Sequence, residues 1–470
     1  MAKQRISTAL ILMLSVSLMI PIIMTPGAHA AGTGAWPPPV SGTWLINVPT
    51  TVANETITLQ GDLIVNSSAV FRNTTLIIAS TASIHYRIEV TEHGYLTLVN
   101  CTIRAQDPAN PYYVRVYGPV TIQSTLIRNA GYSYGSYGDR TGFWVNTNST
   151  VEVIDSVLED SYYGIFAYHS TGISLNNVTI KADPVAGAAI VLQYSSAVIE
   201  DVDLSGQHGL RVQYSRDVVA DNIVAQAALH PLEIRESDNV TASGSFSSTS
   251  SYVSLGDSTS VVLENTSIDS TSNYGVYATG MADFLFTRSN IHAQLVGVYL
   301  HACQNVTLAD VLVEADASHG IQSDFGTTQL HFEDLKVTSP LQAVSLTNGS
   351  AVAITDSTLV STSTTIRVSD WNGLTLQDDT INGTVCVSLE HVENVVLESS
   401  VVNAEDLGLF FTLVEDFQSD NVTIHANRTG TTYDSSRLVF RNIMFDGESL
   451  GLQFVNTSHC EIVGVTGHVT

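Results

Sequence analysis

Gly142-Phe143-Trp144-Val145 and Gly164-Ile165-Phe166-Ala167 are two copies of the short pattern that decides the fold of this chain. Each copy has a small residue, an apolar residue, any residue and another apolar residue. Further copies begin, with a looser first position, at Ala189, Gly209, Pro231, Tyr252, Gly275, Gly297, Gly320, Ala343, Thr365, Val385, Gly408 and Gly451. Successive starts are 20 to 25 residues apart, apart from a last step of 43 residues that we interpret as two turns, so the mean period is about 22.

Two further apolar positions follow each start. One recurs about nine residues later, as at Val151 and Ile173, and the other follows a turn rich in Asp and Asn, as in Asp221-Asn222-Ile223. Short β-branched pieces that alternate with period two are typical of strands, and no helical stripe is sustained beyond residue 30. A left-handed hexapeptide coil would instead repeat every ~18 residues. We therefore predict an all-β, right-handed parallel β-helix of about 22 residues per turn and roughly 19 turns, about 90 Å long at ~4.8 Å per turn.

Stacked turns predict ladders of equivalent side chains. The seventh position of five consecutive copies is serine, and the preceding position places Tyr194 over Tyr214. We expect a structural hydroxyl ladder and an aromatic stack, not catalytic serines. The ladder residues are Ser170, Ser195, Ser215, Ser237 and Ser258.

With this period, residues 45–470 resemble the pectate-lyase-like superfamily of right-handed parallel β-helix proteins. A closer likeness lies in Gln60-Gly61-Asp62-Leu63-Ile64-Val65 and in Ile88-Glu89-Val90-Thr91-Glu92-His93-Gly94-Tyr95-Leu96-Thr97-Leu98. These runs are similar to the opening turns of large secreted, chiefly archaeal, cell-surface β-helix proteins. The resemblance implies a fold and a location, but no particular activity.

The first thirty residues have the organisation of a secretory signal peptide. Lys3 and Arg5 precede an apolar run over residues 9–24, and Ala28-His29-Ala30 supplies small residues for cleavage. An uncleaved anchor is the alternative. We expect residues 1–30 to be a signal peptide, 31–44 a tether or cap, and 45–470 a single β-helix domain that is secreted or held at the cell surface, with no membrane span in the mature chain.

The chain's final residues continue the pattern without an evident cap. An uncapped coil exposes a strand edge that pairs readily with another chain. We therefore expect either end-to-end self-association or further C-terminal domains.

The charge composition excludes nucleic-acid partners. The chain has 45 acidic and 18 basic residues, a net charge of −27, and Lys181 and Lys336 are the only lysines past residue 30. Loss of Lys3 and Arg5 with the signal peptide leaves 16 basic against 45 acidic residues, or −29. Nucleic-acid binding requires several cations to neutralise phosphates, which this chain lacks.

The resemblance also implies where catalytic residues would stand in polysaccharide-cleaving relatives. Polygalacturonase-like members pair Asp-Asp with a Ser-His-Gly about one turn later. Here Ser318-His319-Gly320 precedes Asp378-Asp379, and His319 lies 59 residues before Asp378, nearly three turns away and in the reverse order. Arg211, Arg216 and Arg235 lie on adjacent turns, where a solvated or salt-bridged face explains them. We therefore assign no catalytic residue.

Metal ligands are weakly indicated. The histidines form no recognisable metal motif, so we expect no transition metal. Acidic residues recur at one turn of the coil, and stacked carboxylates either bind calcium or hydrogen-bond the local backbone; we favour the second reading and leave calcium open. These residues are Asp155, Asp201, Asp221, Glu264, Asp310, Glu333, Asp334, Asp356, Asp378 and Glu398.

The four cysteines lie too many turns apart for disulfides, so we predict four free thiols, with Cys386 and Cys460 acting as small core residues. Asn-x-Ser/Thr sequons are more frequent than chance, because Asn suits the turn and the next residues suit a strand. On an exported rod they are also candidate N-glycosylation sites. They are Asn54, Asn66, Asn73, Asn100, Asn148, Asn177, Asn239, Asn265, Asn305, Asn348, Asn382, Asn421, Asn427 and Asn456.

One aromatic patch departs from the repeat. Tyr112, Tyr113 and Tyr117 precede a Tyr- and Gly-rich segment over residues 131–140. Aromatic faces beside Asp and Arg suit sugar binding, whereas the alternative is a loop that packs its own tyrosines against the coil. The candidate carbohydrate-binding residues are Tyr132, Tyr134, Tyr137, Asp139, Arg140, Trp144, Tyr162 and Tyr163.

These observations predict an exported, cell-surface structural or adhesive rod whose partners are extracellular glycans or cell-surface proteins. The alternative is a polysaccharide-active enzyme, a lyase or glycoside hydrolase, with an unusual site. A pair of carboxylates beside an Arg or Lys in a groove would favour the enzyme.

Overall fold

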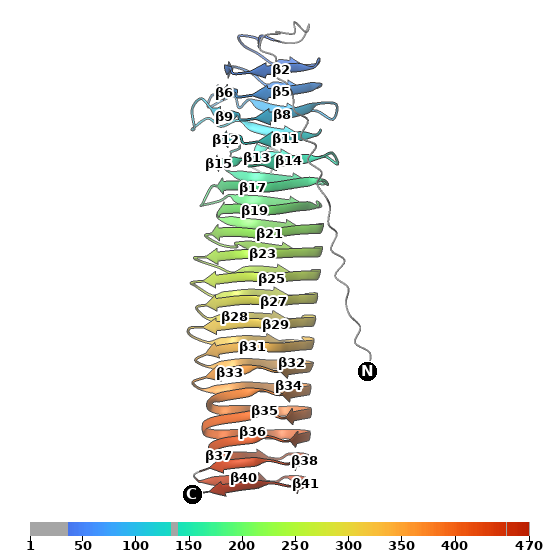
Figure 1. The fold of residues 1–470 in the computed structure, drawn as a ribbon, viewed down its shortest axis with the longest axis vertical. Helices are drawn as coiled ribbons and strands as arrows, with labels where there is room; N and C mark the ends of the chain where they lie inside the picture. Colours follow the sequence, from blue (N-terminus) through green and yellow to red (C-terminus); the bar gives the residue numbers. More distant parts are fainter. Residues whose placement is uncertain (1–35, 133–139, 448, 470) are drawn as a thin grey trace, which may run out of the picture.

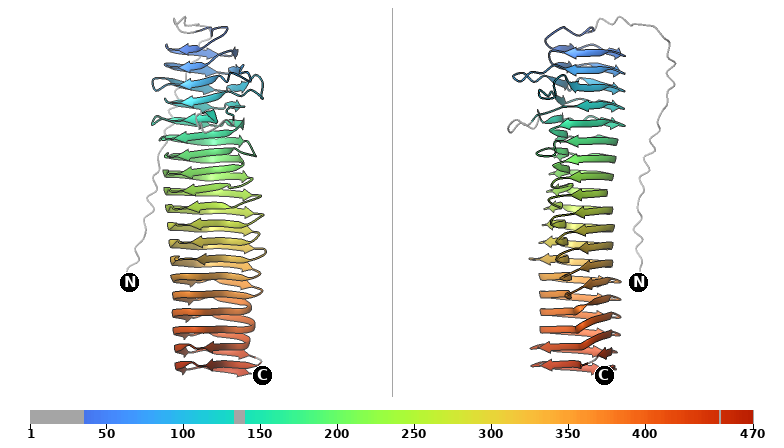
Figure 2. Two further views of the ribbon diagram at one scale, coloured as in Figure 1. Left: turned by 180° about the vertical axis from the view of Figure 1, so that it is seen from behind. Right: turned by 90° about the vertical axis from the view of Figure 1, so that its left-hand side faces the viewer.

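The described residues wind into one long coil of parallel strands (Figure 1). The computed structural model describes residues 36–132, 140–447 and 449–469, and these ranges contain 42 strands and no α-helix. Figure 2 shows from two further sides that each turn lies directly over the next. The predicted signal peptide, residues 1–30, lies outside the described residues. No helix of membrane-spanning length and apolarity occurs in the ranges that the structure describes.

Each turn contributes strands to three faces, and every strand pairs in parallel with its equivalents one turn away. The first face is formed by β1 (Trp44–Ile46), β4 (Leu63–Val65), β7 (Arg87–Val90), β10 (Tyr113–Val116), β13 (Gly142–Val145), β16 (Tyr163–Tyr168), β18 (Ala188–Gln193), β20 (His208–Gln213), β22 (Leu232–Arg235), β24 (Val253–Gly256), β26 (Tyr274–Thr279), β28 (Val296–His301), β30 (His319–Asp324) and β40 (Leu450–Val455). The second face has β2 (Thr50–Ala53), β5 (Ser68–Arg72), β8 (Tyr95–Val99), β11 (Val120–Gln123), β14 (Val151–Ile154), β38 (Ser436–Arg441) and β41 (Ser458–Val463). The third face has β3 (Thr56–Leu59), β6 (Thr75–Ile78), β9 (Thr102–Ala105), β12 (Leu126–Arg128), β15 (Val157–Ser161), β33 (Thr358–Ser361), β39 (Met444–Gly447) and β42 (Thr466–Val469).

The remaining strands bend around a corner and serve more than one face. The second and third faces share β17 (Ile173–Ala182), β19 (Ala197–Gly206), β21 (Arg216–Ala227), β23 (Asp238–Ser248), β25 (Thr259–Ser270), β27 (Ala282–Ala293), β29 (Gln304–Ala315) and β31 (Thr328–Ser339). The first and second faces share β32 (Gln342–Thr355) and β34 (Thr364–Gln377), the third and first share β37 (Thr423–Tyr433), and all three share β35 (Thr380–Glu398) and β36 (Val401–Asp420).

The number of turns can be counted at the corner between the second and third faces. One residue per turn there has a positive φ, which Asn, Asp and Gly adopt more readily than other residues. Nineteen such residues confirm the prediction of roughly 19 turns at a period of about 22. They are Asn54, Asn73, Asn100, Ser124, Asp155, Asn177, Asp201, Asn222, Gly244, Asn265, Arg288, Asp310, Asp334, Asp356, Asp378, Ser399, Asn421, Asn442 and Gly464.

The register of the first face confirms most of the repeat and corrects one turn. The 43-residue step is indeed two turns, because Leu409 pairs with Gly430, which pairs with Leu452. Glycine at the expected apolar position hid this turn from the sequence pattern. In the turn starting at Val385, however, the partner of Ile366 is Val387 rather than Cys386. The predicted register is wrong there by one residue.

The predicted hydroxyl ladder is present at the corner between the first and second faces. The hydroxyl of Ser237 accepts the backbone N–H of Ser215 at 3.1 Å and donates to the carbonyl of Arg235 at 2.7 Å. The same N–H to Oγ bond joins Ser195 to Ser215 and Ser237 to Ser258. Beside it, Tyr194 stacks on Tyr214 with ring centroids 5.0 Å apart, so both ladders are structural.

Candidate functional site

The aromatic patch predicted around residues 131–163 is divided by the structure. Trp144 is only 8% exposed and meets Tyr117 edge-on at 5.3 Å, and Tyr112 and Tyr113 are buried. The buried rings of Trp144, Tyr112 and Tyr113 pack against the coil, as the loop-packing alternative predicts. Tyr134, Tyr137 and Asp139 lie outside the described residues.

The accessible part of that patch borders a cavity. Tyr132 and Tyr162 line a hollow of about 480 Å³, together with Lys181, Asp160 and Asp183. The ring of Tyr132 stacks on the ring of His85, with centroids 4.2 Å apart. The backbone N–H of Tyr132 donates to the backbone carbonyl of Arg140, which places these two residues side by side. Tyr163 meets Tyr162 at 4.9 Å and leads from the hollow toward the first face.

A longer row of rings follows on the first face, and the sequence analysis did not identify it as a site. Ring centroids lie 5.5 Å apart for His208 and His230, and 5.0 Å apart for Tyr277 and Tyr299. Other pairs of neighbours in this row lie 5.0 to 6.4 Å apart. We call this row the aromatic face; it consists of His208, His230, Tyr252, Tyr274, Tyr277, Tyr299, His301 and Phe325.

The repeat explains why these side chains gather. The third residue of each copy points away from the core, so Tyr277 and Tyr299 are direct neighbours on strands β26 and β28. The row runs from β20 to β30, which is five strand spacings or about 24 Å. Comparing the third positions of successive copies would have revealed Tyr277 and Tyr299 only, because the other rings of the row stand at other positions of their copies.

Charged residues adjoin the first end of the aromatic face. Arg211 and Glu233 are cross-strand partners, and Arg211 Nε lies 2.8 Å from Glu233 Oε2. Arg235 Nε lies 2.9 Å from Oε1 of the same carboxylate, which is only 2% exposed. Burial alone would raise the pKa of Glu233, but the guanidinium groups of Arg211 and Arg235 outweigh it and lower that pKa. Glu233 is therefore a fixed anion rather than a proton donor.

His208 lies beside this cluster, with Nδ1 3.8 Å from Glu233 Oε2. Burial, and next the charge of Arg211, lowers the pKa of His208 to about 4. The imidazole is therefore neutral at neutral pH. Arg211, Arg235 and Glu233 are ionised, so the cluster carries a net charge of +1.

A hydrogen-bonded group marks the other end of the aromatic face. Asp324 accepts from Tyr299 Oη at 2.7 Å and from His301 Nδ1 at 2.7 Å. His301 and Asp324 are cross-strand partners on β28 and β30. Burial, reinforced by the contact with Asp324, raises the pKa of Tyr299, so this phenol stays protonated.

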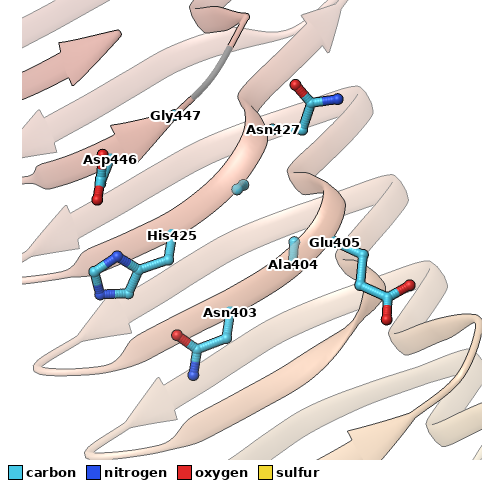
Figure 3. Close-up of a pocket in the computed structure, with 8 residues that line it drawn as sticks. Asn403, Ala404, Glu405, His425, Asn427, Asp446 and Gly447 are labelled. Carbon is cyan, nitrogen blue, oxygen red and sulfur yellow. The ribbon is translucent and has the colours of Figure 1, made fainter. Parts of the chain in front are cut away.

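A second groove lies on the third face, near the end of the coil. It encloses about 550 Å³ and is lined by Asn403, Glu405, His425, Asn427 and Asp446, among others. Figure 3 shows Asn403, His425 and Asp446 one above the other on successive turns. This groove is polar and the imidazole of His425 is the one ring among its described lining residues, so it is a weaker candidate for stacking against sugars than the longer row of rings.

The fragments of a polygalacturonase-like site are not brought together. His319 begins β30 on the first face, whereas Asp378 and Asp379 lie at the corner between the second and third faces. Across the described ranges, no three His, Cys, Asp or Glu side chains are placed to hold a metal ion. The calcium reading stays a prediction, and several of its aspartates are instead hydrogen-bonded; Asp155 Oδ1, for example, accepts from Asn177 Nδ2 at 2.7 Å.

Ten of the fourteen sequon asparagines stand at left-handed corners. The Asn239 side chain donates to Asp217 and that of Asn305 to Asp283, one turn earlier. Turn geometry therefore accounts for the excess of sequons, while their occupancy stays a prediction.

All four cysteines are free thiols. Cys101, Cys303 and Cys386 are buried, and burial raises the pKa of Cys386 to about 12. The prediction that Cys460 is a core residue is wrong, because this side chain is exposed. It pairs with the buried Leu438 but belongs to the last described turns, where little covers it.

Comparison with known proteins supports the fold. Residues 188–337 and 245–381 match the family model described as right handed beta helix region. Among solved structures, a double mutant of the periplasmic alginate epimerase AlgG is 13% identical, with 90% of this chain and 78% of that chain covered and a TM-score of 0.29. The A-module of mannuronan C-5 epimerase AlgE4 from Azotobacter vinelandii is 10% identical (84% and 91% covered, TM-score 0.23). An exopolygalacturonase from Thermotoga maritima is 11% identical (71% and 84% covered, TM-score 0.26). A comparison with curated proteins finds no match.

The chain is thus a parallel β-helix, as its period predicts, and residues 188–381 match the family model of the right-handed form. The solved structures, with TM-scores of 0.23 to 0.29, carry no conclusion about this chain. The similarity of the opening turns to archaeal surface proteins stays a prediction.

Proposed function

We propose that the chain is an exported, cell-surface β-helix rod that binds glycans along its aromatic face. The observation that carries this proposal is the connected row of rings from His208 to Phe325, flanked by ionic groups at both ends. Sugars are bound by aromatic rings that contact their C–H groups and by polar groups that take their hydroxyls. The aromatic face offers both kinds of group along one straight line.

The orientation of the rings supports binding there rather than at the tyrosine stack of the neighbouring corner. Tyr194 and Tyr214 are within 15° of parallel and cover each other's faces. On the aromatic face, Tyr252 meets Tyr274 at 86°, and Tyr274 meets Tyr277 at 65°. Rings at such angles do not cover one another's faces, so this part of the row is available to a ligand. From Tyr277 to Phe325 the rings are within 22° of parallel and stack as the corner pair does.

The polar groups supply hydrogen bonds of defined direction. Arg211 and Arg235 contact Glu233 through Nε, and their side chains are 24% and 53% exposed. At the other end, each carboxylate oxygen of Asp324 accepts one hydrogen bond, from Tyr299 and from His301 respectively, and keeps a second lone pair for a ligand. A chain of several sugar units would reach from one group to the other over about 24 Å.

Affinity electrophoresis of the full chain against neutral and acidic polysaccharides tests the proposal. We expect at least one polymer to retard the protein, and Tyr277→Ala with Tyr299→Ala to weaken that binding at least about tenfold. The matched control is Tyr194→Ala with Tyr214→Ala, which removes two stacked and more exposed tyrosines (44% and 42%) from the corner. Binding that is lost in the control but not in the first variant would refute the site.

A second candidate, a polysaccharide-active enzyme, is favoured by one arrangement. Asp324 holds Nδ1 of His301, which leaves Nε2 without a hydrogen-bond partner in the described residues, as a general base requires. Release of reducing ends or unsaturated uronates by the wild-type chain, lost in His301→Gln while binding remains, would establish this activity. If a polymer binds but is recovered unchanged, enzymatic activity on that polymer is excluded.

A further inference from the structure

A second ladder of buried hydroxyls follows the corner between the second and third faces. In the turns around residues 335–400, each ladder serine accepts one backbone N–H and donates to one backbone carbonyl. Ser357 Oγ accepts the N–H of Leu335 at 3.1 Å and donates to the carbonyl of Thr355 at 2.8 Å. Ser400 Oγ accepts the N–H of Asp379 at 3.1 Å and donates to the carbonyl of Glu398 at 2.7 Å.

Asp379 occupies the same position in the turn between these two serines. Its Oδ1 accepts the N–H of Ser357 at 2.9 Å, as a serine hydroxyl would. The side chain is only 1% exposed, and Oδ2 has no hydrogen-bond partner among the described residues. An ionised carboxylate can only accept, so it cannot supply the donor that serine directs to the carbonyl two residues earlier, here that of Gln377.

We propose that Asp379 is a neutral carboxylic acid in the folded coil, with its proton on Oδ2 replacing the missing ladder hydroxyl, and that loss of this proton destabilises the turn. When Asp379 ionises, its proton passes to water and no other bond forms or breaks. The coil thereby contains a pH-sensitive element in an otherwise non-titrating ladder.

The charges around Asp379 act in the same direction. Asp356 on the preceding turn, Asp378 beside it and Glu398 on the following turn are all acidic, and in the described ranges none of them forms an ion pair with Arg or Lys. Burial first, and then Asp356 and Asp378, raises the pKa of Asp379 to about 8. An uncompensated buried anion would be costly, whereas the neutral acid satisfies the ladder.

The stability of the full chain against pH tests the proposal. The folded pKa lies above the ordinary value of 3.8, so the folded state holds a proton that the unfolded state has released. This group therefore makes stability fall as pH rises from about 4 to about 8, and its effect is constant above that window. Asp379→Asn can both accept and donate but does not titrate, so the midpoint difference between Asp379→Asn and wild type should grow with pH in favour of the variant.

Infrared spectroscopy provides a readout that a merely structural role would not change. At pH 7 the wild type should show the carbonyl stretch of one protonated carboxylic acid, which disappears on titration above pH 8 and is absent from Asp379→Asn. Asp378→Asn, a matched change at the neighbouring position, should retain the band. Absence of the band from wild type at pH 7, or an identical pH profile in wild type and Asp379→Asn, would overturn the proposal.

Discussion

At the level of single residues, buried serine hydroxyls stabilise five consecutive turns of this coil. At the corner between the first and second faces the backbone cannot pair with itself alone, and the serines supply the missing acceptor. Cys303 occupies an equivalent position, where its sulfur donates to the carbonyl of His301. The positions therefore favour a small group that can donate and accept, which is why the sequence shows Ser in five consecutive turns before Met281 interrupts the ladder.

Replacement of Ser237 by Ala should lower the free energy of unfolding by about 1–3 kcal/mol, because the N–H of Ser215 would lose its buried acceptor. The urea midpoint of the full chain measures this. Ser245→Ala, at an exposed position on strand β23, is the matched control and should change the free energy of unfolding by less than about 0.5 kcal/mol. Equal effects of the two changes would contradict the ladder's role.

At the scale of elements, Glu233 ties strand β22 to β20 through Arg211 and also contacts Arg235 on its own strand. Glu233→Gln should destabilise the chain at pH 7, but by less than the roughly 3–5 kcal/mol of a fully buried pair, because Arg235 is half exposed. The lowered pKa of Glu233 sets the pH dependence. Its contribution is present above the ordinary glutamate pKa of 4.5 and is lost as pH falls through the folded pKa, so wild type and variant should converge in acid.

Thermal unfolding of wild type and Glu233→Gln from pH 7 down to pH 3 checks this expectation. Asp238→Asn is the matched control, since its partner Arg216 is largely exposed and the pair should contribute little. A difference that stays constant across this range would show that the carboxylate's charge is not what stabilises β22.

The elements also show where sequence reasoning reaches its limit. Apolar alternation predicted the strands because burial selects the inward residues of every turn, but Gly430 broke the pattern while keeping its place in the register. Next to Val385, two adjacent buried residues made the inward position ambiguous. The site was harder still. Burial does not select the residues at outward positions, so the sequence shows that Tyr277 and Tyr299 are neighbours only when the register is known. Trp144 follows a tyrosine-rich segment, which predicts a binding residue, but the coil buries it.

At the scale of the whole molecule, the protein is a straight rod. Nineteen turns are separated by eighteen spacings of about 4.8 Å, so the coil should be about 86 Å long. The chain is rich in Ser, Thr and Asn, and the net charge of −29 carried by the residues past 30 is distributed over this length. Small-angle scattering should therefore give the profile of a thin rod of this length, and a compact, nearly spherical profile would contradict the fold.

The central claim is that one line of rings on the first face holds a glycan. Hydroxyl-radical footprinting with a polysaccharide that retards the protein tests it most directly, since it reports the exposure of each tyrosine. We predict protection of Tyr252, Tyr274, Tyr277 and Tyr299, with Tyr194 and Tyr214 unchanged. Protection confined to Tyr194 and Tyr214, or to residues off the first face, would contradict the account.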